Sequence, residues 1–170
     1  MDFLELAKER YSVRSFEKRP VEDEKIEKII EAGRVAPTAC NNQPQRIICV
    51  KSEEGLEKLK KCTSCHFNAP LAFIIGYDKN EAWKRSFDGK SSGDIDASIV
   101  ATHMMLEAWE EGIGSTWVMY FIPEAVNEEF GIGDDIEPTA ILVMGYAGSG
   151  AKPAGLHFDK KNKEETVKTI

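Results

Sequence analysis

The stretch Arg10-Tyr11-Ser12-Val13-Arg14-Ser15-Phe16 concentrates cations in a chain that is otherwise acidic. Arg10 and Arg14 are four residues apart, and the Ser12 hydroxyl lies between them. If this stretch is helical or tightly turned, the two guanidinium groups project to the same side. A guanidinium presents a planar fork of donors that binds phosphate through two hydrogen bonds. The stretch therefore predicts a binding site for an anion with several oxygens.

A second polar stretch, Ala36-Pro37-Thr38-Ala39-Cys40-Asn41-Asn42-Gln43-Pro44, follows the clearest amphipathic helix of the N-terminal half, predicted over residues 22–35. Pro37 cannot continue that helix, because its ring removes a donor and clashes with the preceding turn. Small residues here let a backbone approach a flat ligand closely, and the amides of Asn41 and Gln43 can hydrogen-bond the edge of such a ligand. The stretch predicts a ligand-binding loop that a proline fixes at each end.

The two stretches together resemble the flavin-dependent nitroreductase family. Members of that family carry an Arg-x-Ser-x-Arg/Lys element, followed by an Ala-Pro-Ser/Thr-x-x-Asn-x-Gln-Pro element. Both elements are present here in the right order, which is more specific than either one alone. Further similarity to the family extends over most of the chain, in Asp94-Ile95-Asp96-Ala97-Ser98, Gly112-Ile113-Gly114-Ser115-Thr116-Trp117, Gly145-Tyr146 and His157-x-Asp159-Lys160.

Helices alternate with buried strands along the chain, and this pattern indicates an α/β fold, an α+β sandwich. Helices are predicted over residues 2–10, 22–35, 53–61, 94–112 and 123–130, and strands over 47–50, 71–77, 115–121 and 141–146. The resemblance implies a central mixed β-sheet flanked by helices, in a nitroreductase-like fold whose C-terminal tail reaches the partner subunit. With 170 residues, the chain fits a single FMN-binding domain over residues 1–170.

The resemblance assigns the cationic stretch to FMN. It implies that Arg10 and Ser12 bind the phosphate and ribityl region, and that Arg14 lies near the pyrimidine end of the ring. Positive charge at that end favours the anionic reduced flavin. Lys160 stands where the family usually has an arginine that also binds the phosphate, and Lys161 is an equally good candidate for that role.

The loop is implied to contact FMN from the opposite subunit, which predicts a homodimer with two sites at the subunit interface. The loop residues concerned are Pro37, Thr38, Ala39, Asn41 and Gln43. The family also places a backbone amide near the flavin N5 after the strand that contains Trp117. Here that amide belongs to Val118, Met119 or Tyr120. No side chain is expected to act as a nucleophile, because the hydride chemistry belongs to FMN N5.

The implied function is that of an FMN-dependent oxidoreductase. It transfers hydride in a ping-pong reaction from NADH or NADPH to a small flat acceptor such as a nitroaromatic or a quinone. An alternative is a flavin-binding protein that serves storage or sensing without efficient turnover. The sequence carries no nucleotide fingerprint that would separate NADH from NADPH.

Cys62-Thr63-Ser64-Cys65-His66 allows a different interpretation, because C-x-x-C-H is the sequence of covalent haem attachment and could also serve thiol redox chemistry or zinc. Haem attachment requires export to an oxidising compartment, and a zinc site requires a fourth ligand. The simplest interpretation is a reduced pair of thiols at the end of a helix. No metal is expected.

Composition limits the remaining function classes. The formal net charge of −7 and the pI of about 5.1 argue against nucleic acid or an anionic membrane as the main partner. No stretch approaches the ~20 apolar residues that a membrane span needs. The N-terminus is acidic and amphipathic, unlike a signal peptide. A cytoplasmic location with four reduced cysteines is therefore predicted.

Overall fold

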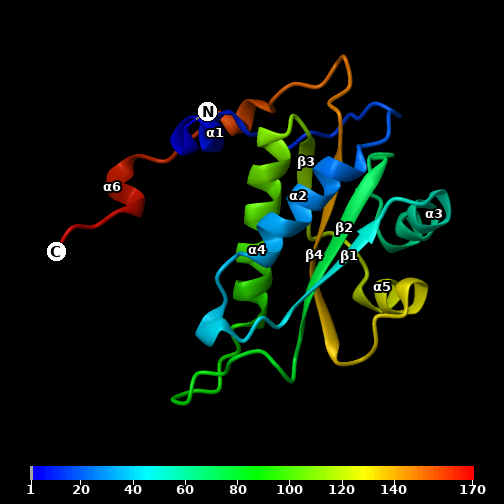
Figure 1. Cartoon of the computed structure of the whole chain (residues 1–170). Helices are drawn as coiled ribbons and strands as arrows, with labels where there is room; N and C mark the ends of the chain where they lie inside the picture. The colour runs from blue at the N-terminus through cyan, green and yellow to red at the C-terminus, as the bar shows by residue number, and fades with distance from the viewer. Residues whose placement is uncertain (1) are drawn as a thin grey trace.

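A four-stranded sheet separates two layers of helices in the computed structural model, which describes residues 2–170 (Figure 1). The strands lie in the order β1-β2-β4-β3. Their bounds are β1 Gln45–Val50, β2 Leu71–Asp78, β3 Gly114–Val118 and β4 Ile136–Gly145. The apolar run that predicted a central strand is β2, whose residues 71–77 are all buried. The two most apolar strands therefore occupy the centre of the sheet.

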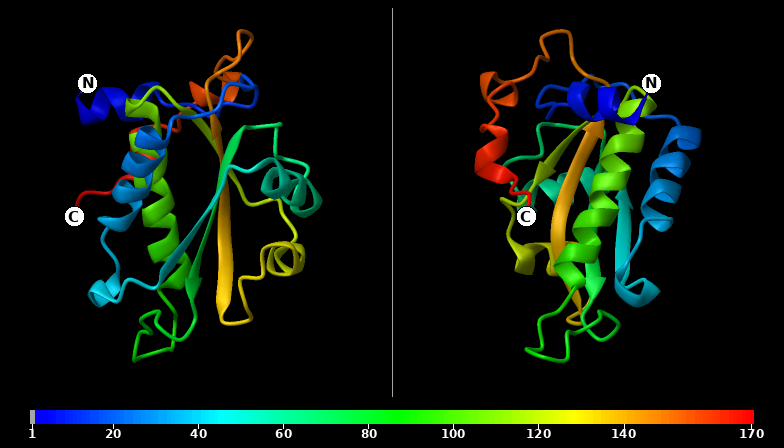
Figure 2. Two further views of the ribbon diagram at one scale, coloured as in Figure 1. Left: turned by 45° about the vertical axis from the view of Figure 1, so that its right-hand side comes forward. Right: turned by 90° about the vertical axis from the view of Figure 1, so that its left-hand side faces the viewer.

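Helices cover both faces of this sheet, as Figure 2 shows in its left view. On one face lie α2 (Asp23–Arg34) and α4 (Gly93–Glu110), and on the other lie α3 (Glu53–Cys62) and α5 (Pro123–Phe130). The shorter helices are α1 Phe3–Glu9, η1 Ala39–Asn41, η2 Gly155–His157 and α6 Lys163–Thr166. The predicted α+β sandwich with a central sheet between helices is confirmed.

One detail of the expected sheet is wrong, because the three strand pairings are all antiparallel. Helix α3 returns the chain to the end of the sheet that β1 has just left, so that Val50 pairs with Ala72 near the start of β2. A crossover to the opposite end would be needed for parallel neighbours. Within residues 2–170, parallel pairing is limited to one isolated bridge between Ser12 and Ser115.

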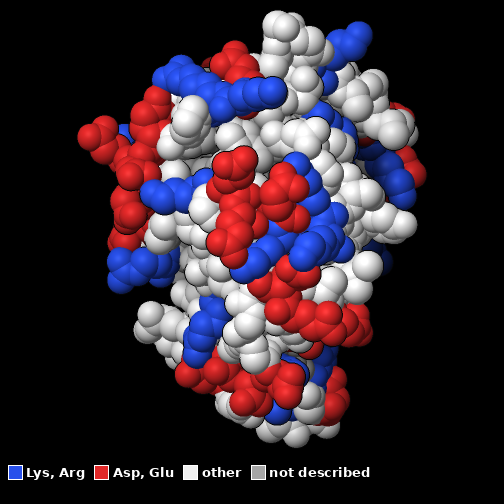
Figure 3. Space-filling model, turned by 90° about the vertical axis from the view of Figure 1, so that its right-hand side faces the viewer, with Lys and Arg blue, Asp and Glu red and all other residues white. Residues whose placement is uncertain are grey.

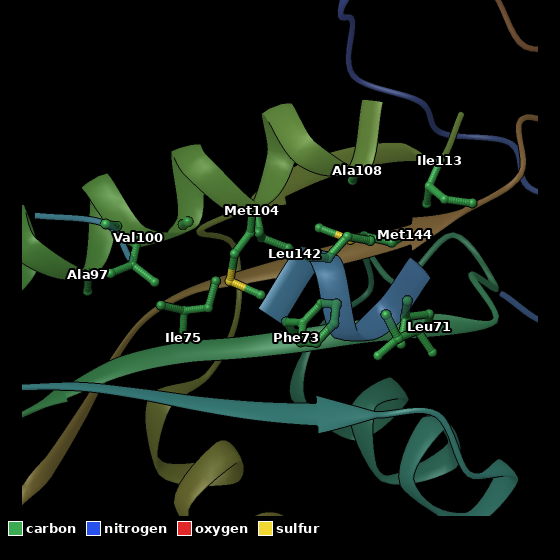
Figure 4. Packing of buried hydrophobic residues seen from close by; sticks show 14 of the residues in the cluster. Leu71, Phe73, Ile75, Ala97, Val100, Met104, Ala108, Ile113, Leu142 and Met144 are labelled. Carbon is green, nitrogen blue, oxygen red and sulfur yellow. The ribbon is translucent and has the colours of Figure 1, made fainter. Parts of the chain in front are cut away.

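Helix α4 supplies the centre of the larger core. Its residues Ala97, Val100, Met104 and Ala108 are fully buried. Figure 4 shows their side chains pointing at apolar residues of the two central strands, among them Phe73. The helix is apolar around most of its circumference, as expected of a helix that is buried on more than one side. It is the rigid element against which the neighbouring loops are placed.

Helices α3 and α5 pack over a second core on the opposite face of the sheet. Lys61 of α3 and Glu129 of α5 form an ion pair with an N–O distance of 2.9 Å. Figure 3 views the molecule from this side and shows acidic and basic residues interspersed over it. Neither positive nor negative charge therefore dominates the surface on this side.

Several predicted boundaries differ from the structure. Strand β4 begins at Ile136, five residues before the predicted start at Ile141. Strand β3 ends at Val118 instead of Phe121, because the chain turns directly after it and Phe121 N donates to Met119 O. Helix α4 begins at Gly93, with Ser92 at its N-cap, so Asp94 and Asp96 lie inside the first turn and do not cap the helix. Both carboxylates accept hydrogen bonds from other segments instead, and this places them in tertiary contacts.

Glu22, the N-cap residue of α2, accepts a hydrogen bond from the hydroxyl of Tyr146, the residue that follows β4. Hydrogen bonds from the Tyr146 hydroxyl, from its own backbone and from Arg19 lower the pKa of the Glu22 carboxyl to about 2, from 4.5. Because the pKa is lower in the folded state, the ionised carboxylate stabilises the fold above about pH 4.5. That contribution is lost as the pH falls towards 2.

We therefore expect Glu22→Gln to lower the melting temperature at pH 7. The difference from wild type should shrink between pH 4.5 and 2, measured by circular dichroism across a pH series. Glu24→Gln, at an exposed position in the same turn, serves as the control. A Glu22→Gln deficit that stays constant down to pH 2 would contradict the assignment.

None of the helices in residues 2–170 combines the length and the apolarity that a membrane crossing requires.

Candidate functional site

The stretch from Arg10 to Arg14 is extended, not helical. Helix α1 ends at Glu9, and Arg10 is its C-cap, with φ −58° and ψ 129°. Ser12 then bridges to Ser115 in β3, and Val13 N donates to Ser115 O at 3.0 Å. In extended backbone, alternate side chains point to the same side. Arg10, Ser12 and Arg14 therefore share a side, as the sequence predicted, but for a different geometric reason.

The residues between them point inward and fix this segment to the body of the protein. Val13 is fully buried, and a Cβ at Gly114 would come within 2.6 Å of the Val13 side chain. Thr116 Oγ1 donates to Val13 O. The Tyr11 ring meets the Trp109 ring of α4 edge-on at a centroid distance of 5.3 Å. The two arginines thus extend from a segment that is fixed to β3 by hydrogen bonds and to α4 by the Tyr11 ring.

Arg10 and Arg14 differ from the other arginines in their partners. Arg19, Arg34, Arg46 and Arg85 each form an ion pair with a carboxylate. Within residues 2–170 neither Arg10 nor Arg14 forms one, although Glu5, Glu9 and Glu17 are close in sequence. Arg14 donates only a long bond of 3.4 Å to Ser12 O. Two cations on one side of an extended segment are thus without a carboxylate partner among residues 2–170.

The C-terminal segment returns to the same end of the molecule. The His157 ring lies 6.3 Å from the Tyr11 ring, edge to face, and Lys160 Nζ donates to His157 O at 2.9 Å. The structure therefore brings the segment of Lys160 towards the stretch that holds Arg10. Lys160 and Lys161 are both exposed, so either ammonium group could serve an anion there.

The loop from Ala36 to Pro44 is strongly bent. Cys40, Asn41 and Gln43 have φ values of 52°, 55° and 51°, in the left-handed region that asparagine tolerates best. Thr38 Oγ1 accepts from Gln43 N at 3.1 Å, which closes the loop on itself. Asn41 and Gln43 are exposed, so their amides face outward.

A buried carboxylate positions this loop. Asp96, only 2% exposed in the first turn of α4, accepts from Ala39 N at 2.9 Å and from Ser92 Oγ at 2.7 Å. The loop is therefore attached to the N-terminal end of α4, whereas the arginine stretch lies at its C-terminal end (Figure 1).

The two halves of the predicted site are far apart within one chain. Asp96 and Trp109 are 13 residues apart in α4, and a rise of 1.5 Å per residue separates them by about 20 Å. One chain therefore does not bring Arg10, Ser12 and Arg14 together with Asn41 and Gln43. A site that uses both halves needs a second chain.

Comparison with known proteins identifies the family. A sequence model described as the nitroreductase family matches residues 7–70 and 66–146. The chain belongs to the nitroreductase family. The solved structure of a nitroreductase family protein from Clostridium difficile superimposes with a TM-score of 0.93 at 46% identity, covering 99% of this chain and 98% of that one.

Other members of the nitroreductase family have more specific names. A protein of Archaeoglobus fulgidus named as an NADH dehydrogenase/NAD(P)H nitroreductase is 31% identical over 150 residues, which are 84% of each chain. A structure from another Clostridium difficile strain, titled an FMN-dependent nitroreductase, has a TM-score of 0.81 at 27% identity, with 98% of both chains covered. The prediction of an oxidoreductase related to NAD(P)H nitroreductases is confirmed at the level of the family.

The residues at the arginine end fit a phosphate-bearing cofactor such as the FMN of that neighbour. Ser115 is 1% exposed and its backbone bridges to Ser12. Its buried hydroxyl lacks a hydrogen-bond partner in the described part of the chain. Together with Arg10, Ser12 and Arg14, it provides hydroxyl and guanidinium donors without a carboxylate to compete for them. These residues could hold a phosphate and the polar chain attached to it.

The turn after β3 presents backbone and two large side chains. Val118 is buried, whereas Met119 and Tyr120 are 71% and 77% exposed. The backbone direction changes at these residues, where the family resemblance places an amide near the flavin.

Cys62, Cys65 and His66 do not assemble into a ligand set in the structure. Cys62 is 1% exposed, and burial raises the pKa of its thiol, which disfavours the reactive thiolate. His66 Nδ1 accepts from Asn68 N at 3.0 Å. All four cysteines are free thiols, and no cluster of three metal-binding side chains occurs among residues 2–170.

Sequence reasoning did not assign Asp96 and Ser115 to the candidate site. Asp96 carried one signal, since a carboxylate on a helix that is apolar nearly all round must find a partner. Ser115 belongs to the stretch 112–117 that resembles the family, but its residue type did not mark it as a binding residue. Their role depends on contacts between segments that are far apart in the sequence.

Proposed function

We propose that this protein is an FMN-dependent NAD(P)H oxidoreductase that reduces small flat acceptors such as nitroaromatics or quinones. The observation that carries the proposal is the unpaired state of Arg10 and Arg14. In an acidic protein whose other arginines are paired, two guanidinium groups on one side of an extended segment indicate an anionic ligand. Family membership makes the phosphate of FMN the best candidate for that anion.

The residues divide into distinct roles. Arg10 and Ser12 would bind the phosphate and ribityl chain, with Lys160 or Lys161 adding charge, and Arg14 would favour negative charge on the ring. FMN held by these residues would supply the hydride chemistry between NAD(P)H and the acceptor, in two separate half-reactions. The turn from Val118 to Tyr120 would present backbone groups to the ring.

We further propose a homodimer, in which Pro37, Thr38, Ala39, Asn41 and Gln43 of one chain complete the site of the other. The separation of about 20 Å along α4 supports this arrangement, because one chain cannot supply both halves. An apolar hollow of about 760 Å³ over α1, α2 and α4 offers a surface for the second copy. It includes Phe3 and Val35, which are 71% and 67% exposed. The exposed C-terminal tail, residues 147–170, would extend onto the partner.

The experiment is the visible spectrum of the purified protein, before and after acid precipitation. A yellow protein that releases free FMN supports the cofactor site. Bleaching by NADH or NADPH, followed by reoxidation with a nitroaromatic, supports turnover. A protein that stays yellow and is not bleached would favour the alternative of flavin storage or sensing. A colourless protein that does not bind added FMN would contradict the proposal, and a haem spectrum would point to Cys62, Cys65 and His66.

A further inference from the structure

The C-x-x-C-H sequence packs against the turn that follows β3. Ile122 N donates to Cys62 O at 2.9 Å, and Thr63 Oγ1 donates to Tyr120 O at 2.5 Å. Two consecutive residues at the end of α3 therefore bind both sides of the turn formed by residues 119–122. The segment from Cys62 to His66 therefore holds the turn after β3. The proposed function assigns no other role to this segment.

The Thr63 hydroxyl is the side chain that makes this contact. Thr63 is 5% exposed, and its Oγ1 also accepts from Cys65 N at 3.0 Å. The hydroxyl therefore donates to one segment and accepts from another. A serine could keep both bonds, whereas a valine of similar shape could keep neither.

Besides these bonds, the turn is supported by Phe121, which packs against the second core, and by Ile122, which leads directly into α5. Met119 and Tyr120 are largely exposed, and Ile122 is 56% exposed. A hollow of about 390 Å³ opens between the end of α3 and this turn, so the backbone has room to move when a bond is lost. The local bond from Phe121 N to Met119 O shapes the turn but does not attach it to the rest of the protein. Within residues 2–170, the Thr63 hydroxyl is the side-chain group that donates to Tyr120 O.

We propose that Thr63 is a positioning residue, whose hydroxyl holds the turn from Met119 to Ile122 so that its backbone is correctly placed for the flavin. This inference rests on the proposed function, because it assumes that the turn faces a bound flavin. The hydrogen bonds themselves belong to the protein alone. They can therefore be tested independently of cofactor chemistry.

The experiment compares Thr63→Val with Thr63→Ser in the full chain. Thr139→Val is the matched control, since Thr139 is 7% exposed and its hydroxyl donates at 2.9 Å to Asp94 Oδ1, which belongs to α4 and not to the turn. Hydrogen exchange is measured on the peptide that covers residues 119–122, together with the dissociation constant for FMN and the steady-state kinetics. If Thr63→Val aggregates, Thr63→Ala is measured in its place.

We expect Thr63→Val to speed amide exchange in residues 119–122 and to raise the dissociation constant for FMN about five-fold, the effect of one ordinary hydrogen bond. The kcat should fall while the KM for NAD(P)H stays unchanged. Thr63→Ser should remain within about two-fold of wild type, and Thr139→Val should lower the melting temperature without affecting the turn.

Unchanged exchange and unchanged FMN affinity in Thr63→Val would overturn the inference, even with a lower melting temperature. Faster exchange in Thr63→Val without any effect on FMN affinity or kcat would also overturn it, because the turn would then be irrelevant to the flavin. If the wild type binds no FMN, the proposed function fails first, and the wild-type spectrum shows that before any variant is made.

Discussion

Replacement of both Arg10 and Arg14 with alanine should weaken FMN binding by about 100-fold or more, because each charge-assisted hydrogen bond contributes about 1.5–3 kcal/mol. The two effects need not be additive, since both guanidinium groups serve one ligand. The fold should persist, because neither arginine forms an ion pair within residues 2–170 and Arg14 is exposed. Titration of the cofactor-free protein with FMN, followed by flavin fluorescence, measures the loss.

The matched control is Arg34→Ala with Arg85→Ala. These arginines pair with Glu31 and Asp88 and lie outside the candidate site. The control removes the same formal charge, so it corrects for a general electrostatic effect on an anionic ligand. We expect it to stay within about two-fold of wild type after that correction. Equal losses in the two double variants would show that Arg10 and Arg14 act only through net charge.

A lysine at position 14 separates charge from geometry. Lysine keeps the cation but lacks the planar fork of donors that grips an oxyanion at two points. Arg14→Lys should therefore lie between wild type and Arg14→Ala in FMN affinity. If Arg14→Lys binds FMN as well as wild type, the site needs only a positive charge at position 14. The exposed Lys160 and Lys161 could supply charge of the same kind nearby.

Most of the fold could be predicted from local pattern. The apolar run from Leu71 to Tyr77 predicted a buried central strand, and Pro123 and Gly131 bracket the predicted helix that is α5. These signals lie within a few residues of the structure that they determine. The antiparallel sheet was not predicted correctly, because strand direction depends on where α3 returns the chain and not on the composition of any strand.

The candidate site was predictable as a list of residues but not as an arrangement. The shared side of Arg10 and Arg14 was expected from a helical turn, whereas it arises from extended backbone paired with Ser115. The loop with Asn41 was expected to bind a ligand, but its attachment to Asp96 depends on a contact over 57 residues. Hydrogen bonds between distant segments leave no periodic trace in the sequence.

The distance between the two halves makes the dimer testable by complementation. In the proposed dimer, one site takes its arginine half from one chain and its loop half from the other. A chain with Arg10→Ala and Arg14→Ala is combined with a chain that carries Asn41→Ala and Gln43→Ala, and two affinity tags isolate the mixed dimer. One of its sites then carries both defects and the other carries neither, so we expect about one FMN per mixed dimer, although each variant alone binds poorly.

A second mixed dimer, with all four substitutions in one chain, tests whether the intact site of the first dimer comes from the exchange of halves between subunits. A chain with all four substitutions, combined with a wild-type chain, spreads the defects over both sites if the halves come from different subunits. That mixed dimer should bind almost no FMN at a concentration that saturates wild type. If both halves came from the same chain, the outcomes would be reversed, with no intact site in the first pairing and one in the second. Because the two pairings contain the same substitutions in equal number, only the subunit origin of each half can produce a difference between them.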